Sequence, residues 1–444
     1  MNVEEQVLAR VKPSDQDQSI IEETVQKLIE TVMGTEAASK CQFETYLVGS
    51  IAKNTHLKDP DADVFLLFDP ETSREELEKH GLAIGKEAIT GREHYAEHPY
   101  IKGQFQGLKA DIVPAYKILD GSQKMSAVDR TPFHTEYVKK NLRPELQDHV
   151  RLLKAFMKGI GTYSAEARVM GFSGYLCELL VIRFGGFHKV LENASDWKRG
   201  QMLEIGEKSE GEFDAPLAFI DPVDPSRNVS SAVSVDSLET FIAASGDYLV
   251  EPDLKFFFPE PVKQLSGDEI NQMLEHRGGM LTAIMPKPDI IDDILYPQLR
   301  KFEKNACQML FNSDFRIMDS ANYVIDGEMA IIIELENSTL PESKLHRGPP
   351  VWIKENTDNF LDKWRGHEDA LSAPFIKDGC WQVFVIRKHV SALELLRTGL
   401  SSLDMGKNLN KLKDSVEIRA EVPDSDITVK AFSEYLDREL PWRR

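Results

Sequence analysis

The chain has 444 residues, 41% of them hydrophobic and 28% charged, and its formal net charge is −20. This length is too great for one hydrophobic core and indicates roughly three domains of an ordinary globular protein. So acidic a chain should adhere weakly to nucleic acid in general, which argues against a protein that coats RNA; any RNA binding would depend on local basic patches and on the shape of one structured substrate.

Sequence features also bear on location and on cysteine chemistry. No apolar run approaches the ~20 residues that a membrane span requires. The first ten residues contain Glu4 and Glu5 and no apolar core, which argues against a signal peptide. Four widely spaced cysteines without Cys-x-x-Cys spacing argue against structural zinc and a disulfide framework. We therefore expect a cytoplasmic protein without a membrane partner; a homodimer is compatible with these features, which do not fix the oligomeric state.

The first third of the chain has the pattern of a small α/β domain. Apolar residues at helical spacing predict a helix over 19–32, which ends at Gly34. Strands are predicted at three places, 46–50, 63–68 and 109–114. A helix over 74–87 is predicted between the second and the third strand. This alternation indicates a catalytic α/β domain over residues 1–141.

Three aspartates on two of these strands predict phosphoryl-transfer chemistry with two metal ions. Side chains two residues apart in a strand project to the same face, so Asp61 and Asp63 point together. Asp111 interrupts the apolar run of the later strand and supplies a third carboxylate if the two strands are neighbours. Such a set suits Mg²⁺ and can hold two ions roughly 3.5 to 4 Å apart. We therefore assign Asp61, Asp63 and Asp111 as catalytic metal ligands.

A Gly-Ser pair strengthens this interpretation. Gly49 lets a backbone turn approach phosphate closely, and the hydroxyl of Ser50 adds a donor. Taken singly, the acidic segment 59–63 is most often a solvated turn, and a Gly-Ser pair is an ordinary loop. The combination favours a metal site, because a solvated turn does not explain why Asp63 runs directly into the apolar residues 64–68, or why an unpaired charge interrupts a second strand, where it is costly.

The remainder of the chain divides into a helical part and a second α/β part. Periodicity predicts helices at three places in the helical part, 145–158, 173–184 and 234–249. Residues 142–257 are therefore predicted to form a helical central domain. Residues 258–444 return to alternation, with predicted strands over 328–335 and 380–388 and predicted helices over 296–311, 356–365 and 392–403.

Longer segments resemble a known family. The order of Gly-Ser, Asp-x-Asp and a later single Asp resembles the nucleotidyltransferase superfamily typified by polymerase beta. Five blocks are similar to the archaeal, class I CCA-adding enzymes: 95–100, 126–134, 171–180, 221–229 and 287–299. The likeness runs from about Gly49 to Leu299 and weakens afterwards. It implies an α+β multidomain fold with a nucleotidyltransferase α/β head, a helical middle domain, and a C-terminal α/β body with an RRM-like tail. The body and the tail would bind tRNA.

The resemblance also implies which side chains contact the nucleotide triphosphate: Ser50, Lys53, His134, Lys154 and Tyr163. Positive groups and donors around the β and γ phosphates fit phosphoryl transfer, which requires little covalent work from the protein. Lys53 stands where the family more usually has arginine. The ordinary alternatives are that Lys154 is a solvated surface charge, that His134 is a buried and satisfied histidine, and that Tyr163 is a core aromatic.

Arg227 is the candidate for reading the incoming base. Cytosine and adenine both present a ring-nitrogen acceptor beside an exocyclic amine, whereas uracil and guanine present a ring N–H beside a carbonyl. A guanidinium donor that faces the acceptor would accept the first pair and reject the second. Asp224 is close enough in sequence to share this site and to orient Arg227. The alternative is a surface salt bridge worth about 0 to 1 kcal/mol.

Contacts with tRNA are expected at two places. Tyr95, His98 and Tyr100 form an aromatic and imidazole run that can stack on unpaired bases, at about 1 to 3 kcal/mol each; such residues are also common in cores. Lys301 and Lys304, one helical turn apart, match positions that are usually arginine in the family. They are expected to meet the acceptor-stem backbone, the alternative being ordinary solvated lysines.

Together, the residues and the resemblance imply a CCA tRNA nucleotidyltransferase. It would add C, C and A to the 3′ end of tRNA from CTP and ATP, with two Mg²⁺ ions per site and no nucleic-acid template. The nearest alternative is a poly(A) polymerase-like terminal nucleotidyltransferase, which keeps the same carboxylates and would differ over residues 221–227. A noncatalytic RNA-binding relative is disfavoured, because all three carboxylates are present.

Overall fold

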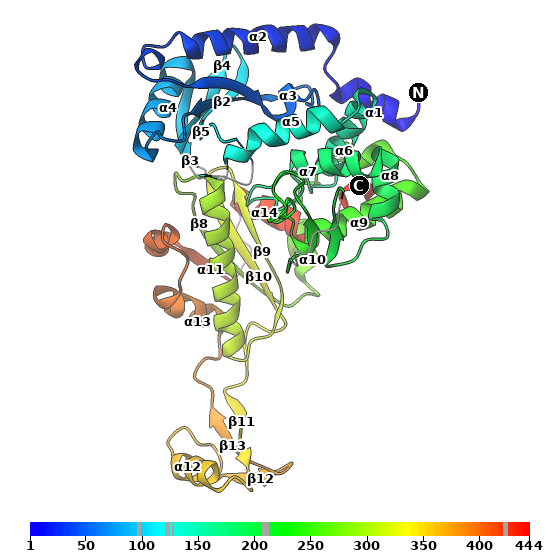
Figure 1. Ribbon diagram of the computed structural model, residues 1–444. Helices are drawn as coiled ribbons and strands as arrows, with labels where there is room; N and C mark the ends of the chain where they lie inside the picture. The colour runs from blue at the N-terminus through cyan, green and yellow to red at the C-terminus, as the bar shows by residue number, and fades with distance from the viewer. Residues whose placement is uncertain (96–98, 120–124, 127, 207–212, 421–424) are drawn as a thin grey trace. The chain divides into compact units, whose positions relative to one another are not determined.

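The computed structural model describes residues 1–95, 99–119, 125–126, 128–206, 213–420 and 425–444 (Figure 1). They form two compact units. The first comprises Met1–Pro261 together with Glu439–Arg444, and the second comprises Val262–Arg438. Across the described part of the chain, no helix is both long and apolar enough to cross a membrane.

A five-stranded sheet organises the start of the first unit. Its order is β1-β2-β5-β4-β3; β2 and β5 pair in parallel and the other neighbours pair antiparallel. The strands are β1 (Glu44–Val48), β2 (Asp61–Phe68), β3 (Thr90–Tyr95), β4 (Pro99–Phe105) and β5 (Leu108–Tyr116). Two helices cover one face, α2 (Asp15–Met33) and α4 (Arg74–Ala88) (Figure 1).

Strand alternation decides which face of the sheet carries the chemistry. In β2, Val64 and Leu66 are buried in the core beneath α2 and α4. Asp61 and Asp63 alternate with these residues, so their side chains project to the opposite face. The predicted strands and helices of this region are confirmed, with boundaries that differ by a few residues.

The hairpin of β3 and β4 was not predicted. Its strands carry polar side chains that are exposed or only partly buried, among them Arg92, Glu93, Lys102 and Gln104. Such strands have no apolar run, so hydrophobic pattern gives little sign of them.

Helices dominate the rest of the first unit. They are α3 (Gly49–Ala52), α5 (Thr131–Asn141), α6 (Gln147–Gly159), α7 (Gly174–Phe184), α8 (Phe187–Ala194) and α9 (Val235–Val250), accompanied by the short parallel pair β6 (Gln201–Leu203) and β7 (Leu217–Phe219). Their core holds a cluster of aromatic rings around Phe156, which meets Phe187, Phe241 and Tyr248 edge-on. The three predicted helices correspond to α6, α7 and α9. The short helix α8 was not predicted.

Both ends of the chain pack into this helical core. Helix α1 (Val3–Val11) lies against α6 and buries Val7. The C-terminal segment returns to the first unit, where the Trp442 ring stacks on Phe256 with centroids 5.7 Å apart. The Trp442 Nε1–H also donates to the Asp247 carboxylate at 2.9 Å.

The second unit contains two antiparallel sheets. The larger has the order β14-β8-β10-β9 and the smaller β11-β13-β12. The strands are β8 (Gly279–Pro286), β9 (Ile317–Ile325), β10 (Glu328–Leu335), β11 (Ser343–Pro350), β12 (Phe375–Lys377), β13 (Cys380–Ile386) and β14 (Glu417–Arg419). The predicted strands correspond to β10 and β13.

Helices cover both faces of the larger sheet. The helices of this unit are α10 (Gly267–Leu274), α11 (Asp292–Asn312), α12 (Lys354–Trp364), α13 (Ala392–Gly399) and α14 (Asp426–Leu436). Helices α11 and α13 share a core with one face of the sheet, and α10 and α14 share a core with the other. The three predicted helices correspond to α11, α12 and α13.

Candidate active site

Two partly buried carboxylates meet where β2 and β5 run side by side. Asp63 and Asp111 are direct partners in the parallel register of these strands. Burial, Asp111 and Asp61 together raise the pKa of Asp63 to about 7. Burial also raises the pKa of Asp111, whose Oδ2 lies 3.5 Å from the Lys102 ammonium. The two strands are neighbours, which is the condition under which the sequence allowed Asp111 to join Asp61 and Asp63.

This arrangement suits a divalent cation, because like charges held this close repel each other unless a cation lies between them. Asp111 Oδ1 is buried and has no hydrogen-bond partner among the described residues. Asp61 is more exposed, and its Oδ1 lies 4.0 Å from the Lys109 ammonium. Among the described residues, no three His, Cys, Asp or Glu side chains converge as a ready metal-ligand set. Mg²⁺ is usually held by one or two carboxylates together with substrate phosphates, so the pair fits such an ion.

Gly49 is shaped to the carboxylate of Asp63. Its φ is +75°, a conformation that L side chains rarely adopt. A Cβ at this position would lie 2.0 Å from Asp63 Oδ2. Glycine is therefore required for both backbone conformation and space. Ser50 follows it in α3, and its carbonyl accepts the Thr55 N–H at 3.0 Å.

Gly49→Ala should lower the rate of nucleotide addition by about 100-fold, because it pushes Asp63 out of place and catalysis is that sensitive to displacements of about 1 Å. Gly200→Ala is a matched control: its φ is +79°, and no atom of the described residues lies within 4 Å of the added methyl group. The Gly200→Ala variant should therefore report only the effect of backbone strain. Steady-state rates and melting temperatures of both variants provide the measurement; equal rates for the two would contradict the proposed fit.

Another carboxylate, which is fully buried, holds the two lysines assigned to the triphosphate. Glu178 lies on α7, and its Oε2 is 2.5 Å from the Lys53 ammonium. Its Oε1 accepts from Thr55 Oγ1 at 2.6 Å and from Lys154 at 3.3 Å. Burial opposes its ionisation, but the two lysines hold the pKa of Glu178 below its ordinary value. The structure thus brings Lys53 and Lys154 together on one group.

Lys154 is not a surface charge. It is 2% exposed, and it also donates to the Thr55 carbonyl at 3.1 Å. Burial lowers the pKa of Lys154. A methyl group added at Gly174 would lie 3.1 Å from the Tyr163 hydroxyl and 3.6 Å from Lys154 Nζ. Lys154 and Tyr163 therefore border the same point at the start of α7. The interpretation of Lys154 as a solvated lysine was wrong, because α6 is buried on most sides.

A further fully buried carboxylate contacts both His134 and Arg227. Asp221 Oδ2 lies 2.9 Å from His134 Nε2 and 2.9 Å from an Arg227 guanidinium nitrogen. Its Oδ1 accepts from the Tyr175 hydroxyl at 3.2 Å. The Asp224 carboxylate instead pairs with Arg130 at 2.7 Å. The expectation that Asp224 orients Arg227 is corrected here: the carboxylate that pairs with Arg227 is Asp221, because the loop folds back on itself between the two residues.

Three family models match the chain in order: a nucleotidyltransferase domain over residues 35–134, the second domain of tRNA nucleotidyltransferase over 148–258, and the C-terminal domain of CCA-adding enzymes over 277–421. A CCA-adding enzyme of Methanosarcina barkeri is 38% identical over 412 residues, or 91% of this chain and 90% of that relative. The CCA-adding enzyme of Thermoplasma acidophilum is 38% identical over 416 residues, 93% and 94% of the two chains.

This chain belongs to the CCA-adding enzyme family. The resemblance found in the sequence is thereby confirmed, and its fold is the mixed α/β fold of nucleotidyltransferases. The likeness to CCA-adding enzymes extends well beyond Leu299, since the C-terminal family model reaches residue 421.

The residues assigned to tRNA are less closely grouped. His98 lies outside the described residues, as does the side chain of Tyr95. The Tyr100 ring, on β4, lies 5.8 Å from that of His94 on the paired strand. In the second unit, Lys301 on α11 pairs with Asp404 at 2.5 Å, whereas Lys304 is exposed. These assignments remain predictions for this member of the CCA-adding enzyme family.

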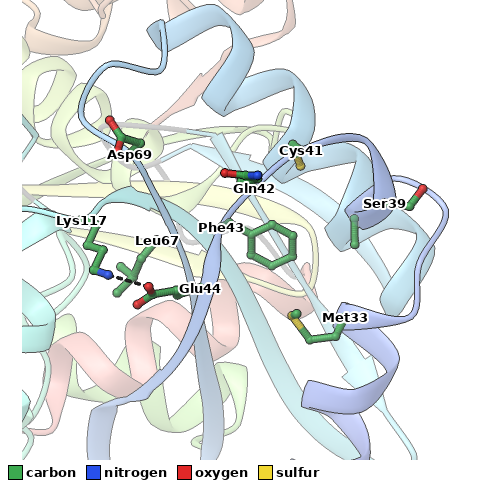
Figure 2. A pocket seen from close by; sticks show the side chains of 10 residues that line it. Met33, Ser39, Cys41, Gln42, Phe43, Glu44, Leu67, Asp69 and Lys117 are labelled. Carbon is green, nitrogen blue, oxygen red and sulfur yellow. Dashed lines mark hydrogen bonds and ion pairs between the residues drawn. The ribbon is translucent and has the colours of Figure 1, made fainter.

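A surface pocket of about 510 Å³ lies elsewhere on the first unit. Figure 2 shows Glu44, Leu67, Asp69 and Lys117 around it, with an ion pair between Glu44 and Lys117. These residues come from the start of β1, the end of β2 and the segment after β5. Asp63 and Asp111 lie toward the opposite end of β2 and β5, so this pocket is separate from the carboxylates.

Sequence reasoning missed Glu178 and Asp221 as organisers of the site. Both were within the family-like blocks, but no role was assigned to either. A single carboxylate in the apolar run of α7 was the available signal for Glu178, since a buried charge requires a partner. Asp221 offered no comparable signal, because Asp224 is nearer to Arg227 in the sequence.

Proposed function

We propose that the protein adds C, C and A to the 3′ end of tRNA from CTP and ATP, without a nucleic-acid template. The observation that carries this proposal is the partly buried pair of Asp63 and Asp111 on adjoining strands, in a chain that matches the family over about nine-tenths of its length. The finer architecture belongs to the same proposal: a catalytic head over 1–141, a helical middle domain over 142–257, and a body with an RRM-like tail over 258–444 that bind tRNA.

The catalytic step depends on the carboxylates. Asp61, Asp63 and Asp111 would hold two Mg²⁺ ions, which activate the attacking hydroxyl and stabilise the leaving oxygen. Asp111, whose Oδ1 has no partner among the described residues, accepts the hydrogen bond of the tRNA 3′ hydroxyl. The site offers little covalent chemistry, so its rate enhancement comes from positioning and from charge.

The triphosphate is bound by the groups held around Glu178 and Asp221. Lys53 and Lys154 supply two ammonium groups, and Ser50, His134 and Tyr163 supply hydroxyl and imidazole contacts. Both lysines are almost fully buried, so their attraction to phosphate is screened less than that of surface lysines. Preorganised positive charge of this kind stabilises the charge that develops during transfer.

Base selection is assigned to Arg227. Its side chain is 31% exposed, so it can still reach a ligand while Asp221 holds one guanidinium nitrogen. A guanidinium N–H facing the ring-nitrogen acceptor of C or A is compatible with both bases and is opposed by the ring N–H of U or G.

Arg227→Ala should reduce kcat/KM for CTP and ATP by about tenfold to 150-fold, the effect of losing a charged hydrogen bond at a desolvated site. Rejection of UTP and GTP should relax at the same time. The measurement compares all four nucleotides on the same tRNA. A variant with wild-type rates for C and A and undiminished rejection of U would return base selection to another part of the chain.

Binding of tRNA should weaken with salt despite the net charge of −20. Lys304→Ala should reduce affinity and lower the slope of log K against log salt by about one. Lys301→Ala should have a smaller effect, because Lys301 must first leave Asp404. Filter binding over a salt series checks both variants, and equal affinity for unstructured RNA of the same length would contradict recognition of tRNA shape.

One assay tests the proposed activity. Purified protein is incubated with Mg²⁺, labelled CTP or ATP, and tRNA that lacks its 3′ CCA. Addition of two C residues and one A residue supports the proposal. Continued addition of A to any RNA would identify a poly(A) polymerase-like enzyme, and no addition at all would identify a noncatalytic RNA-binding relative.

A further inference from the structure

Asp221 is a fully buried carboxylate in a short loop that folds back on itself. Its exposure is 0%, and it follows strand β7 by two residues. Its backbone N–H donates to the Arg227 carbonyl at 3.0 Å, and Ile220 bridges to Asn228 beside it. The loop is therefore closed by backbone hydrogen bonds, which fix the place of the carboxylate before any nucleotide binds.

Side chains from three separate elements converge on this carboxylate. His134 comes from α5, Tyr175 from α7 and Arg227 from the loop itself. The rings of His134 and Tyr175 also stack, with centroids 4.2 Å apart and planes at 21°. A fourth bond comes from the Val223 N–H at 3.0 Å, so Asp221 is bonded on both oxygens.

The protonation of this group fixes the direction of its hydrogen bonds. Burial opposes ionisation, but His134, the Val223 N–H and Arg227 hold the pKa of Asp221 below its ordinary value. An ionised carboxylate only accepts, so His134 Nε2 must donate to it and His134 Nδ1 faces elsewhere. The pKa of His134 is lowered, mainly by burial. The hydrogen bond and charge of Asp221 act in the opposite direction, whereas the positive charges of Arg227 and Arg130 lower this pKa further.

We propose that Asp221 is a positioning residue that holds both Arg227 and His134, so that reading of the base and binding of the triphosphate depend on one buried carboxylate. This inference rests on the proposed function, in which Arg227 meets the base and His134 the triphosphate. A nucleotide whose base does not fit Arg227 would then also disturb the histidine that contacts its phosphates.

The first test is Asp221→Asn, a substitution that keeps the size of the side chain and removes its charge. KM for CTP and ATP should rise by about tenfold to 150-fold, as expected when charged hydrogen bonds are lost, and discrimination against UTP should fall. Arg227→Ala and His134→Ala should each add little further loss in the Asp221→Asn background, because residues that act through one group are non-additive. Full additivity of the three substitutions would overturn the proposal.

The control is Asp247→Asn, which removes a carboxylate that pairs with Arg443 at the C-terminal segment of the same unit. It should leave KM unchanged. Melting temperature and tRNA affinity are measured for every variant, so that a folding defect is recognised.

A second measurement does not require Asp221→Asn to fold. In Arg227→Ala, the pKa of His134, followed by NMR titration of the nucleotide-free protein, should rise, because a cation that shares Asp221 has been removed. An unchanged His134 pKa would overturn the shared-carboxylate proposal. Failure of the wild-type protein to add C and A to tRNA would overturn the proposed function instead, so the two outcomes are distinguishable.

Discussion

Replacing Asp63 or Asp111 by asparagine should reduce nucleotide addition by at least about 100-fold to 1,000-fold, with tRNA affinity nearly unchanged. In the proposed mechanism both residues lie where charge develops during transfer, and loss of one such electrostatic group has effects of this size. Removing either one also removes a ligand for the cation that their mutual repulsion favours. Single-nucleotide addition with labelled CTP measures the rate, and filter binding measures the affinity.

Without metal, the Asp63→Asn and Asp111→Asn variants should be at least as stable as the wild-type protein. The pKa of Asp63 is raised to about 7, so the folded protein binds this proton more tightly than the unfolded chain does. Ionisation of Asp63 therefore costs stability as pH rises from about 4 to 7, and this cost is fully present above pH 7. Asp63→Asn should accordingly melt at or above the wild-type temperature at pH 8.

Asp69→Asn serves as the control for both measurements. Asp69 is exposed just beyond the other end of β2, beside the separate surface pocket (Figure 2). Its substitution should change neither rate nor stability. Turnover of Asp63→Asn or Asp111→Asn within tenfold of wild type would contradict the assignment of these carboxylates as metal ligands.

Glu178→Ala should destabilise the first unit and abolish efficient use of nucleotides. It would leave Lys53 and Lys154 as neighbouring, almost fully buried cations without their shared partner. Breaking a buried ion pair from one side costs about 3 to 5 kcal/mol. The loss of position of both lysines should also raise KM for CTP and ATP. Urea unfolding and steady-state kinetics provide the two measurements.

The chain offers a matched exposed pair as the control. Glu239 pairs with Arg199 on the surface of the same unit, where both side chains are about half exposed. Glu239→Ala should leave the free energy of unfolding nearly unchanged, because water screens an exposed ion pair, and should leave KM unchanged. A Glu178→Ala variant as stable as Glu239→Ala would show that the two lysines are accommodated without this carboxylate.

Much of the fold could be predicted because hydrophobic pattern reflects burial. Residues 64–68 are buried on both faces of the sheet, so the apolar strand β2 was evident, and α2 showed its buried stripe in the sequence. Strands β3 and β4 were not evident, because most of their side chains are polar and few, such as Ile101, enter the core, while backbone hydrogen bonds pair the strands. A pattern of side chains carries little information about such strands.

The site was predictable where the chemistry lies on regular structure. Asp63 and Asp111 are neighbours because two strands pair in register, which alternation and chain order could suggest. The partner of Arg227 depends on the reversal of a loop, which brings Asp221 to it and sends Asp224 to Arg130. The burial of Lys154 depends on helices that surround α6. Both are tertiary effects that short-range spacing does not reveal.

The return of Glu439–Arg444 to the first unit makes the second unit an insertion with both of its ends anchored. The stacking of Trp442 on Phe256 and its bond to Asp247 hold that second anchor. A single peptide-bond cleavage near residue 261 would cut the covalent link between residues 1–261 and the second unit, but the noncovalent packing of Glu439–Arg444 would still hold the second unit to the first. In a protein whose units simply follow one another along the chain, no such returning segment would hold the cleaved unit, and a single cut would separate the two.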